Sequence, residues 1–458
     1  MTLLTPKKRI PSRFAHLLAI TDPSFRIGMI GRRSSPTGAW SNGHVTFFLT
    51  LVMVLATAWL ALRLTSVDES HTLSSFDGAS ETSANVALIE TGGSHEEVTA
   101  ALFYAIASVP GVYTSMYLAL PRFGIENVYA WIRRRYKLSP YSVSPLFLFQ
   151  SKEIAPPDLI VLTTCEHDIF AADTALDHQF VAGSERQSLV CVLHHVDRFE
   201  AIEPRLRRWA RANRLRFVTL SSHTAQALRQ EATRVAHDIY DPVHIDEFPP
   251  VFPAPLDPNP PPTDRLSIAI QGNFEDSRRD YLKTLLQFER MMEELPEPIV
   301  SRMQFILAGH GKEVGVPGKI MPYVSVNFSL DFIPYYNLLH ESFALIPAFA
   351  DEGYYKTKAS SSVAASFIAN TPILGSDRLI ESYGYLSRDS MWHEEDVAES
   401  EMTAVYELLR RHFDDQGMEK SSWKVAVTEK KQALRTRALE LMERNARLMR
   451  QIILREGS

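Results

Sequence analysis

The chain contains 458 residues, of which 45% are hydrophobic, 22% are charged and 10% are aromatic. This composition excludes a collagen-like, a disulfide-scaffold or a wholly disordered protein, because the apolar residues can bury a large core. The formal net charge of −6 argues against a protein that binds nucleic acid through a basic surface.

The charge is distributed unevenly at the start of the chain. Residues 1–63 contain eight Lys and Arg and one acid, whereas residues 64–121 contain seven acids and no base. Between the two blocks, Val45–Leu62 is an uncharged apolar run of 18 residues, about 27 Å long as a helix and close to the hydrocarbon thickness of a bilayer. We predict a basic cytosolic tail over 1–44 and a transmembrane signal-anchor over 45–64. A buried core helix is the alternative.

Residues 65–98 are rich in Ser, Thr, Gly and acids. Such a composition cannot bury enough apolar surface to order itself, so we expect an acidic stem over this range. The next uncharged run, Thr99–Leu120, could be read as a second membrane span. Pro110 and Gly111 interrupt it, and its second part is more typical of a buried strand.

From about residue 99 the chain alternates apolar runs with helical patterns, which is typical of a parallel sheet covered on both faces. We predict an α/β domain over 99–241 with helices at Ile125–Lys137 and Pro204–Asn213. Its strands are predicted at Val112–Leu120, Asp158–Thr163, Leu189–Leu193 and Leu215–Leu220.

A proline-rich segment over 242–263 follows, and we expect a stiff, extended linker that lies outside the core. A second α/β domain is predicted over 264–422, with helices at Tyr281–Leu295 and Ser360–Ala369. Its strands are predicted at Leu266–Ile270, Met303–Leu307, Phe343–Ile346 and Thr371–Leu374. Two such domains joined by a hinge indicate an enzyme with a cleft.

The last segment, 423–458, is predicted to be a long helix. Its residues Leu434, Ala438, Leu441, Asn445, Leu448 and Ile452 recur at spacings of three and four. The pattern fits either a short coiled coil or packing on the core, and the small number of heptads favours packing.

Two cysteines, Cys165 and Cys191, stand at the ends of predicted strands. We expect two buried thiols, and a disulfide in an oxidising compartment is the alternative. No Cys and His residues have the spacing of zinc ligands, so we predict no metal.

The candidate site residues follow predicted strands, at the edge where open α/β sheets bind ligands. Gly272 with Arg278 and Arg279 suits a diphosphate, because guanidinium groups bind phosphate oxygens in pairs. A solvated helix start is the alternative. Lys358 precedes a serine cluster at a predicted helix start, which offers free N–H groups to an anion. The members of that cluster are Ser360, Ser361 and Ser362.

In the first domain, His194, His195 and Asp197 follow the strand LVCVL. An imidazole facing a cleft can act as a base or bond a sugar hydroxyl, so we predict that these residues are catalytic. The competing interpretation is a pair of structural histidines in a loop.

Several motifs together resemble a known family. IQGNFEDSRRDY, FILAGHGKEV, DFIPYY and YYKTKASSSVAASFIANTPIL resemble the nucleotide-sugar half of GT-B glycosyltransferases. PDLIVLTTCEHD, LVCVLHHVDRF and FVTLSSHTAQAL resemble the acceptor half. The resemblance covers roughly residues 112–386 and is greatest to fungal type II membrane members distantly similar to glycosyltransferase family 4.

The resemblance implies two Rossmann-like domains that face a cleft, with the diphosphate of the donor between Gly272, Arg278, Arg279, Lys358 and Ser360–Ser362. It implies that Gly309 and Gly311 approach the nucleotide, and that His195 lies near the transferred sugar or the acceptor. Asp351 and Glu352 could supply the first of the two family 4 acids. The position of the second, seven residues before Pro372, is Ala365.

We therefore expect a membrane-anchored glycosyltransferase of the Golgi or endoplasmic reticulum, single-pass and type II, with a lumenal catalytic part. It would transfer a sugar, as a hexosyltransferase, from a UDP- or GDP-sugar to a glycan, glycoprotein or lipid-linked acceptor, without cofactor, metal or nucleic acid. The alternative is a non-catalytic lumenal protein that binds glycan or a partner on the same fold.

Overall fold

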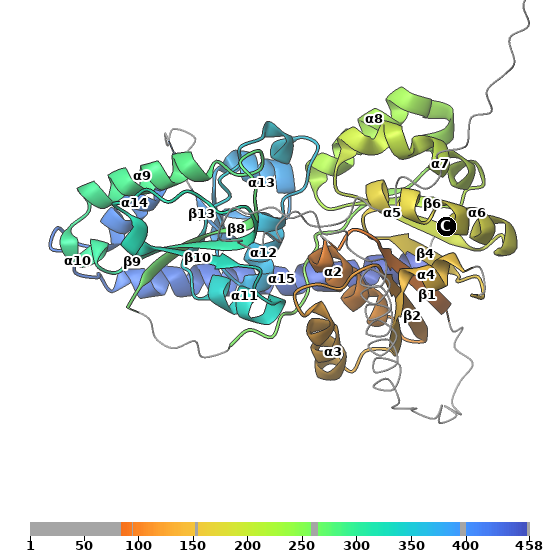
Figure 1. Ribbon diagram of the computed structural model, residues 1–458, viewed down its shortest axis with the longest axis horizontal. Helices are drawn as coiled ribbons and strands as arrows, with labels where there is room; N and C mark the ends of the chain where they lie inside the picture. Colours follow the sequence, from red (N-terminus) through yellow and green to blue (C-terminus); the bar gives the residue numbers. More distant parts are fainter. Residues whose placement is uncertain (1–83, 94, 152–153, 258–263, 394–399, 456–458) are drawn as a thin grey trace, which may run out of the picture. The chain divides into compact units, whose positions relative to one another are not determined.

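The structure is a computed structural model that describes residues 84–93, 95–151, 154–257, 264–393 and 400–455 (Figure 1). They form two parallel sheets with helices on both faces. The predicted cytosolic tail over 1–44 and signal-anchor over 45–64 lie outside the described residues. Within the described ranges, no helix has both the length and the apolar character needed to cross a membrane.

The first lobe, residues 84–247, is built on a sheet of seven parallel strands in the order β3-β2-β1-β4-β5-β6-β7. Its central strands are buried on both faces, which explains their continuous apolar sequences. The strands are β1 (Ala84–Glu90), β2 (Val112–Leu118), β3 (Tyr141–Pro145), β4 (Leu159–Leu162), β5 (Ser188–Leu193), β6 (Leu215–Thr219) and β7 (Ile245–Glu247).

Helices connect the consecutive parallel strands, as they do in a doubly wound fold. They are α2 (Glu96–Ala107), α3 (Ile125–Tyr136), α4 (Leu146–Gln150), α5 (Cys165–Ala171), α6 (Asp173–Ala182), α7 (Phe199–Arg211) and α8 (Ser222–Tyr240).

The expected stem over 65–98 is wrong from Ala84 onwards. β1 occupies the middle of the first sheet, between β2 and β4, and α2 begins at Glu96. The composition of the window conceals a short apolar run, NVALIE, among Ser, Thr, Gly and acidic residues. The predicted break near Pro110 is confirmed, because α2 ends at Ala107 and β2 begins at Val112.

The second lobe, residues 264–393 and 400–412, contains a parallel sheet in the order β10-β9-β8-β11. A bridge between Leu345 and Ile373 continues it towards the pair β12 and β13. The strands are β8 (Leu266–Phe274), β9 (Met303–Gly311), β10 (Val324–Phe328), β11 (Ala344–Leu345), β12 (Leu374–Gly375) and β13 (Trp392–His393).

The helices of the second lobe lie on both faces of its sheet (Figure 1). They are α9 (Tyr281–Glu294), α10 (Glu297–Val300), α11 (Phe332–His340), α12 (Ser361–Ala369), α13 (Asp377–Tyr383) and α14 (Glu401–His412). Alternate residues of β8 enter different cores: Ile268 and Ile270 pack with α9 and α14, and Ala269 packs with α11 and α12.

The long helix α15 (Ser422–Leu454) runs along the second lobe and reaches the first, where it packs against α2 (Figure 1). Leu434, Ala438, Leu441, Asn445 and Ile452 are buried on it, whereas Leu448 is only partly buried. Packing on the core is therefore confirmed. One hydrophobic core, joined by this helix, extends through both lobes.

The expectation that the proline-rich segment lies outside the core is wrong for its first part. Phe248, Val251 and Phe252 are at most 1% exposed, and the Asn445 side-chain amide donates to the Pro249 carbonyl at 2.7 Å. Apolar residues alternate with the prolines, and α15 covers them, so the start of the segment is part of the core rather than a free linker.

Cys165 and Cys191 form a disulfide, so the expectation of two free thiols is wrong. β4 and β5 are neighbours in the sheet, with Leu162 opposite Cys191, and Cys165 follows three residues later at the start of α5. The two Cα atoms are thus 5.2 Å apart, within the range that a disulfide requires. A linear sequence does not reveal which strands are neighbours.

Candidate functional site

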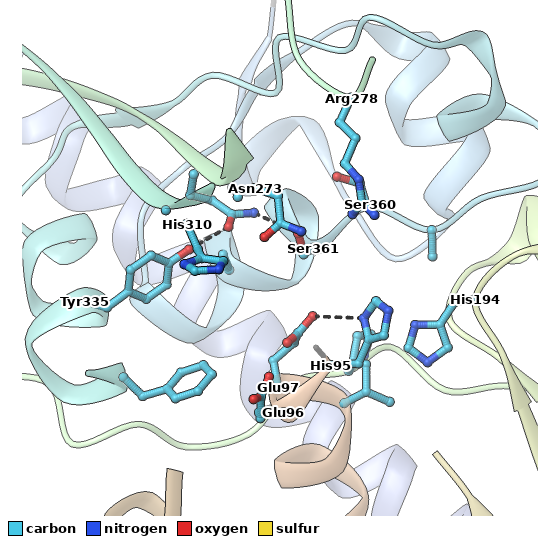
Figure 2. Close-up of a pocket in the computed structure, with 18 of the residues that line it drawn as sticks. His95, Glu96, Glu97, His194, Asn273, Arg278, His310, Tyr335, Ser360 and Ser361 are labelled. Carbon is cyan, nitrogen blue, oxygen red and sulfur yellow. Dashed lines mark hydrogen bonds and ion pairs between the residues drawn. The ribbon is translucent and has the colours of Figure 1, made fainter. Parts of the chain in front are cut away.

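A cavity of about 160 Å³ lies between the two lobes, at the carboxyl ends of their parallel strands (Figure 2). This is more than ten times the space that one water occupies, so it can hold a small organic ligand. Its walls come from the residues after β5 and β10, the ends of β8 and β9, and the amino ends of α2 and α12.

Arg279 is the most deeply buried charge in the wall of the second lobe, with 3% of its surface exposed. Its Nη2 donates to Ser362 Oγ at 2.8 Å and to Ser360 Oγ at 3.3 Å. The rings of Phe349 and Tyr354 lie 5.2 and 5.1 Å from the guanidinium carbon. Among the described residues no carboxylate pairs with Arg279, so a buried positive charge faces the cavity without a counter-charge.

The same serines open helix α12. Ser360 is its N-cap, and Ser360 Oγ accepts from the backbone N–H of Ser362 at 3.1 Å. The positive end of the helix dipole therefore lies beside Arg279. Two sources of positive potential converge at this point of the cavity, and an anion would satisfy both.

Gln271 ties this helix start to the neighbouring strand. Its Nε2 donates to Ser361 Oγ at 3.2 Å and Ser362 Oγ at 3.0 Å, and its Oε1 accepts from the Tyr335 hydroxyl at 2.6 Å (Figure 2). These bonds fix which side of the amide faces which partner. Gln271 and Tyr335 stand within motifs that the sequence singled out, but no spacing rule assigned them a role.

Two glycines shape the floor of the cavity. Gly272 and Gly309 are opposite each other on β8 and β9, and a Cβ on Gly309 would lie 1.8 Å from the Gly272 carbonyl oxygen. Gly272 has φ of 124°, a conformation that favours glycine. The strand ends can approach each other only because Gly309 lacks a side chain, since a Cβ on Gly272 would meet only Arg279 Nη2, at 3.8 Å.

Arg278 also lines the cavity but is nearly half-exposed, and its Nε donates to Glu275 Oε2 at 2.9 Å. His310, next to Gly309, has its Nδ1 2.9 Å from Ser329 Oγ. Arg278 adds a second positive charge near the buried guanidinium.

The wall of the first lobe is made of imidazoles and carboxyl groups. The rings of His95 and His194 have their centroids 4.1 Å apart, and His95 Nδ1 lies 3.8 Å from Glu97 Oε1. His194 Nε2 is 2.7 Å from the Thr163 carbonyl oxygen, which assigns the proton to that nitrogen. The sequence missed His95, Glu96 and Glu97, because they fall in the range that composition assigned to a stem.

Glu166 forms hydrogen bonds to the loop that carries His194 and His195. Its Oε1 accepts from the backbone N–H of His194 at 3.0 Å and of His195 at 2.8 Å. Burial raises the pKa of Glu166 to about 7. A buried carboxyl next to the disulfide thus positions one edge of the cavity.

Burial sets the charge of this wall. It lowers the pKa of His95, His194 and His195 to about 3, so the three imidazoles are neutral at pH 7. It also raises the pKa of Glu96 to about 8 and raises the pKa of Glu97. The first lobe therefore presents hydrogen-bonding groups without positive charge.

The structure places eight of the predicted site residues in the cavity wall: His194, His195, Gly272, Arg278, Arg279, Gly309, Ser360 and Ser361. It does not place the other six there. They are Asp197, Gly311, Asp351, Glu352, Lys358 and Ser362. Their predicted roles stay predictions, and their surroundings explain why they do not line the cavity.

Lys358 is bonded to Asp351 instead of facing the cavity, with Nζ 2.6 Å from Oδ2. Its backbone forms an antiparallel bridge with His195. Glu352 pairs with Arg378. Asp197 is half-exposed, and its Oδ1 lies 4.0 Å from His195 Nδ1.

Ser362 is fully buried behind the wall, where its hydroxyl accepts from Arg279. Gly311 ends β9 beyond the cavity. Across the described ranges, no group of three or more His, Cys, Asp and Glu is arranged to hold a metal ion.

No model of a protein family matches the sequence, and no curated protein matches it either. Among solved structures, the N-terminal domain of trehalose-6-phosphate phosphatase from Candida albicans is similar over 83% of this chain and 99% of its own, with 10% identity and a TM-score of 0.50. HepE from Anabaena, in complex with UDP and glucose, covers 80% of this chain and 99% of its own, with 11% identity and a TM-score of 0.48.

A glycosyltransferase from Rickettsia africae is similar over 82% of this chain and all of its own, with 9% identity and a TM-score of 0.48. At such low identity, the likeness to the Candida domain shows the fold alone. The two parallel-sheet lobes, the cavity at their carboxyl ends and the return of α15 to the first lobe agree with the GT-B fold that the sequence motifs resemble.

Proposed function

We propose that this chain is a glycosyltransferase that takes a sugar from a UDP- or GDP-sugar and transfers it to a glycan, glycoprotein or lipid-linked acceptor. One observation carries the proposal: the buried Arg279 and the amino end of α12 converge on one point of the cavity with no carboxylate partner for the guanidinium among the described residues. A diphosphate would supply the missing negative charge at that point.

The same arrangement suits the chemistry of glycosyl transfer. When the bond between sugar and diphosphate breaks, negative charge grows on the leaving phosphate oxygen. Fixed donors beside that oxygen stabilise the charge as it develops, and they need no reorganisation to do so. Arg279, the half-exposed Arg278 and the free N–H groups of α12 would serve this purpose, so we propose a transfer that requires no metal.

Further details of the proposal depend on the sequence. The motifs favour a hexosyltransferase of the fungal type II group, and the Val45–Leu62 run favours a single-pass anchor with the catalytic part in the Golgi or endoplasmic reticulum lumen. The Cys165–Cys191 disulfide supports the lumenal location, because such bonds persist in oxidising compartments. Microsomes that carry the full chain with a C-terminal tag test this topology: a lumenal tag survives protease until detergent is added, and a cytosolic tag does not.

The activity test uses the full chain in detergent with EDTA and a panel of UDP- and GDP-sugars. We expect free nucleotide to be released from one donor as its sugar passes slowly to water, and less release from the Arg279→Ala variant at the same donor concentration. Absence of both nucleotide binding and release across the panel would contradict the proposal.

A non-catalytic binding protein on the same fold is the second candidate. One observation favours it: Ala365 lines the cavity at the position where family 4 members carry their second acid. Such a protein would bind a nucleotide-sugar without releasing nucleotide, even when its glycan partner is present. Calorimetry and the release assay on one preparation therefore distinguish the two candidates.

A further inference from the structure

Within the described residues, the two larger sheets have four edge strands, β3, β7, β10 and β11. An unprotected edge strand can pair with a strand of another chain, and natural proteins prevent this with charges, proline or very short strands. β7 contains Asp246 and Glu247, and β3 ends in Pro145. β11 has only two residues and is continued by the bridge from Leu345 to Ile373. These three edges therefore have the usual protection.

The edge strand β10 lacks that protection. Its five residues, Val-Ser-Val-Asn-Phe, include no charge and no proline, and β9 is its only strand partner among the described residues. Phe328 at its end is 44% exposed, and Met321 shortly before it is 60% exposed. An uncharged edge with β-branched and aromatic side chains is prone to aggregation through strand pairing. Something other than its own sequence has to cover it.

The same strand contains a motif for N-linked glycosylation. Asn327, Phe328 and Ser329 form Asn-x-Ser, and no other asparagine of the chain has Ser or Thr two residues later. Such a motif accepts an oligosaccharide on the asparagine side chain in a secretory lumen, and the bulky sugar chain makes the surface around it soluble. The single motif of the chain therefore coincides with its least protected edge.

The Asn327 side chain has space for a glycan. It is partly exposed, and its Nδ2 donates to Ser325 Oγ at 2.9 Å, two residues earlier on the same face of the strand. The side chain thus lies back along β10, away from the carboxyl end where the cavity is, and Asn327 does not line the cavity. An amide nitrogen carries two hydrogens, so a glycosylated Asn327 retains one for the bond to Ser325.

We propose that Asn327 carries an N-linked glycan that covers the edge strand β10. The inference depends on the lumenal location that belongs to the proposed function. The Asn327 amide nitrogen forms a bond to the anomeric carbon of an oligosaccharide held on a lipid diphosphate, and the bond from that carbon to the diphosphate oxygen breaks. Its electron pair leaves with the lipid diphosphate, and the amide nitrogen loses one proton.

The glycan is added before the second lobe folds. In the folded chain Ser329 Oγ lies 2.9 Å from His310 Nδ1, and the Ser329 backbone N–H donates to the Gly309 carbonyl at 2.8 Å. The hydroxyl that completes the motif is therefore engaged once β9 and β10 have paired. A chain that is still being synthesised into a lumen has this hydroxyl free, because its domains fold only as they emerge.

The experiment expresses the full chain with a C-terminal tag in a eukaryotic host and compares its gel mobility before and after treatment with peptide N-glycosidase. We expect the mobility to increase by the equivalent of one glycan. Asn327→Gln and Ser329→Ala should abolish the shift, whereas Ser329→Thr should retain it, because Thr also completes the motif. Asn127→Gln is the matched control and should retain the shift, since Asn127 is an exposed asparagine outside any such motif.

The topology of the tag separates two kinds of failure. An unchanged mobility in a chain whose tag is protected in microsomes would overturn the inference and leave the proposed function intact. A shift that persists in Asn327→Gln would also overturn it. An unchanged mobility together with a tag that protease digests would contradict the lumenal location, and the inference with it.

The covering role has a readout of its own. Purified Asn327→Gln should form more aggregate than the wild type in light scattering. The double variant Asn327→Gln with Ser325→Lys should reverse that increase, because a lysine protects an edge strand by its charge. Equal aggregation of Asn327→Gln and the wild type would contradict the role of the glycan in covering β10.

Discussion

Arg279 contacts two serines at the start of α12 that lie 81 and 83 residues later in the sequence. Its guanidinium reaches the serines that begin α12 and lies between two aromatic rings. It is buried because the packing around it is tight, and it remains charged because an arginine does not lose its proton in proteins. A buried charge without a counter-charge is costly, and a bound anion would compensate it.

We predict that Arg279→Ala weakens UDP binding by about 10- to 100-fold, because a hydrogen bond to a charged group contributes about 1.5–3 kcal/mol. Arg279→Lys should lie between this variant and the wild type, since it retains the charge but not the paired donors. Titration calorimetry measures both values. Arg290→Ala, an exposed arginine of α9 in the same lobe, is the control, and equal affinities for Arg279→Ala and Arg290→Ala would contradict the assignment.

The candidate site was only partly predictable at the scale of residues. Arg279, Ser360, Ser361 and His194 were found because a charged or polar group after a buried strand is visible in a sequence. Lys358 could not be placed correctly, because the bridge between its backbone and His195 joins two lobes. No local pattern shows such a contact.

At the scale of strands, the ends of β8 and β9 depend on a close approach of backbones. We predict that Gly309→Ala destabilises the fold by about 1–3 kcal/mol, because the new Cβ would overlap the Gly272 carbonyl oxygen. Gly315→Ala is the control, since a Cβ there would meet no atom within 4 Å. Urea denaturation measures the difference, and equal midpoints for the two variants would show that the strand ends are looser than described.

Helix α15 provides a second test at this scale. Leu441 is 1% exposed and Leu439 is 52% exposed on the same helix. Leu441→Ala should cost about 2–5 kcal/mol of unfolding free energy, whereas Leu439→Ala should change it little. Thermal denaturation of the two variants distinguishes packing on both lobes from a helix that is held only loosely.

Buried strands could be predicted from the sequence better than strands at the edges of the sheets. The predicted strands coincide with observed strands, except that Thr371–Leu374 shares only Leu374 with β12. Strands such as DLIVLT and LVCVL were found because parallel strands buried on both faces have continuous apolar sequences. The strands β1, β3, β7, β10 and β13 were missed. β3, β7 and β10 are edge strands, which are less apolar, and β1 stands in a segment whose overall composition resembles a flexible stem.

At the scale of the whole molecule, opposing groups of buried side chains set the pH range of stability. His95, His194 and His195 have a pKa of about 3 when folded and near 6.5 when unfolded. Their contribution is fully present above pH 6.5 and is lost as the pH falls towards 3. Glu96, Glu166 and Asp168 have pKa values of about 8, 7 and 8 when folded. Their contribution is present below about pH 4 and is lost as the pH rises towards 8.

We therefore predict that Tm is highest between about pH 4.5 and 6.5 and falls from there to pH 8, where only the acids still titrate. Glu166→Gln retains an acceptor for the N–H groups of His194 and His195 but cannot ionise. It should therefore lessen the loss of Tm that begins above about pH 6.5. Identical pH profiles for this variant and the wild type, measured by differential scanning fluorimetry, would exclude Glu166 as a contributor.

The separation of α2 and α15 in the sequence has a consequence for the synthesis of the chain. Helix α2 is buried on nearly all sides, and one of its partners is α15, which leaves the ribosome more than 300 residues later. Until α15 has been synthesised, apolar residues of the first lobe are therefore uncovered and accessible to chaperones. A premature stop codon before α15 would leave the first lobe in the exposed state that quality control recognises.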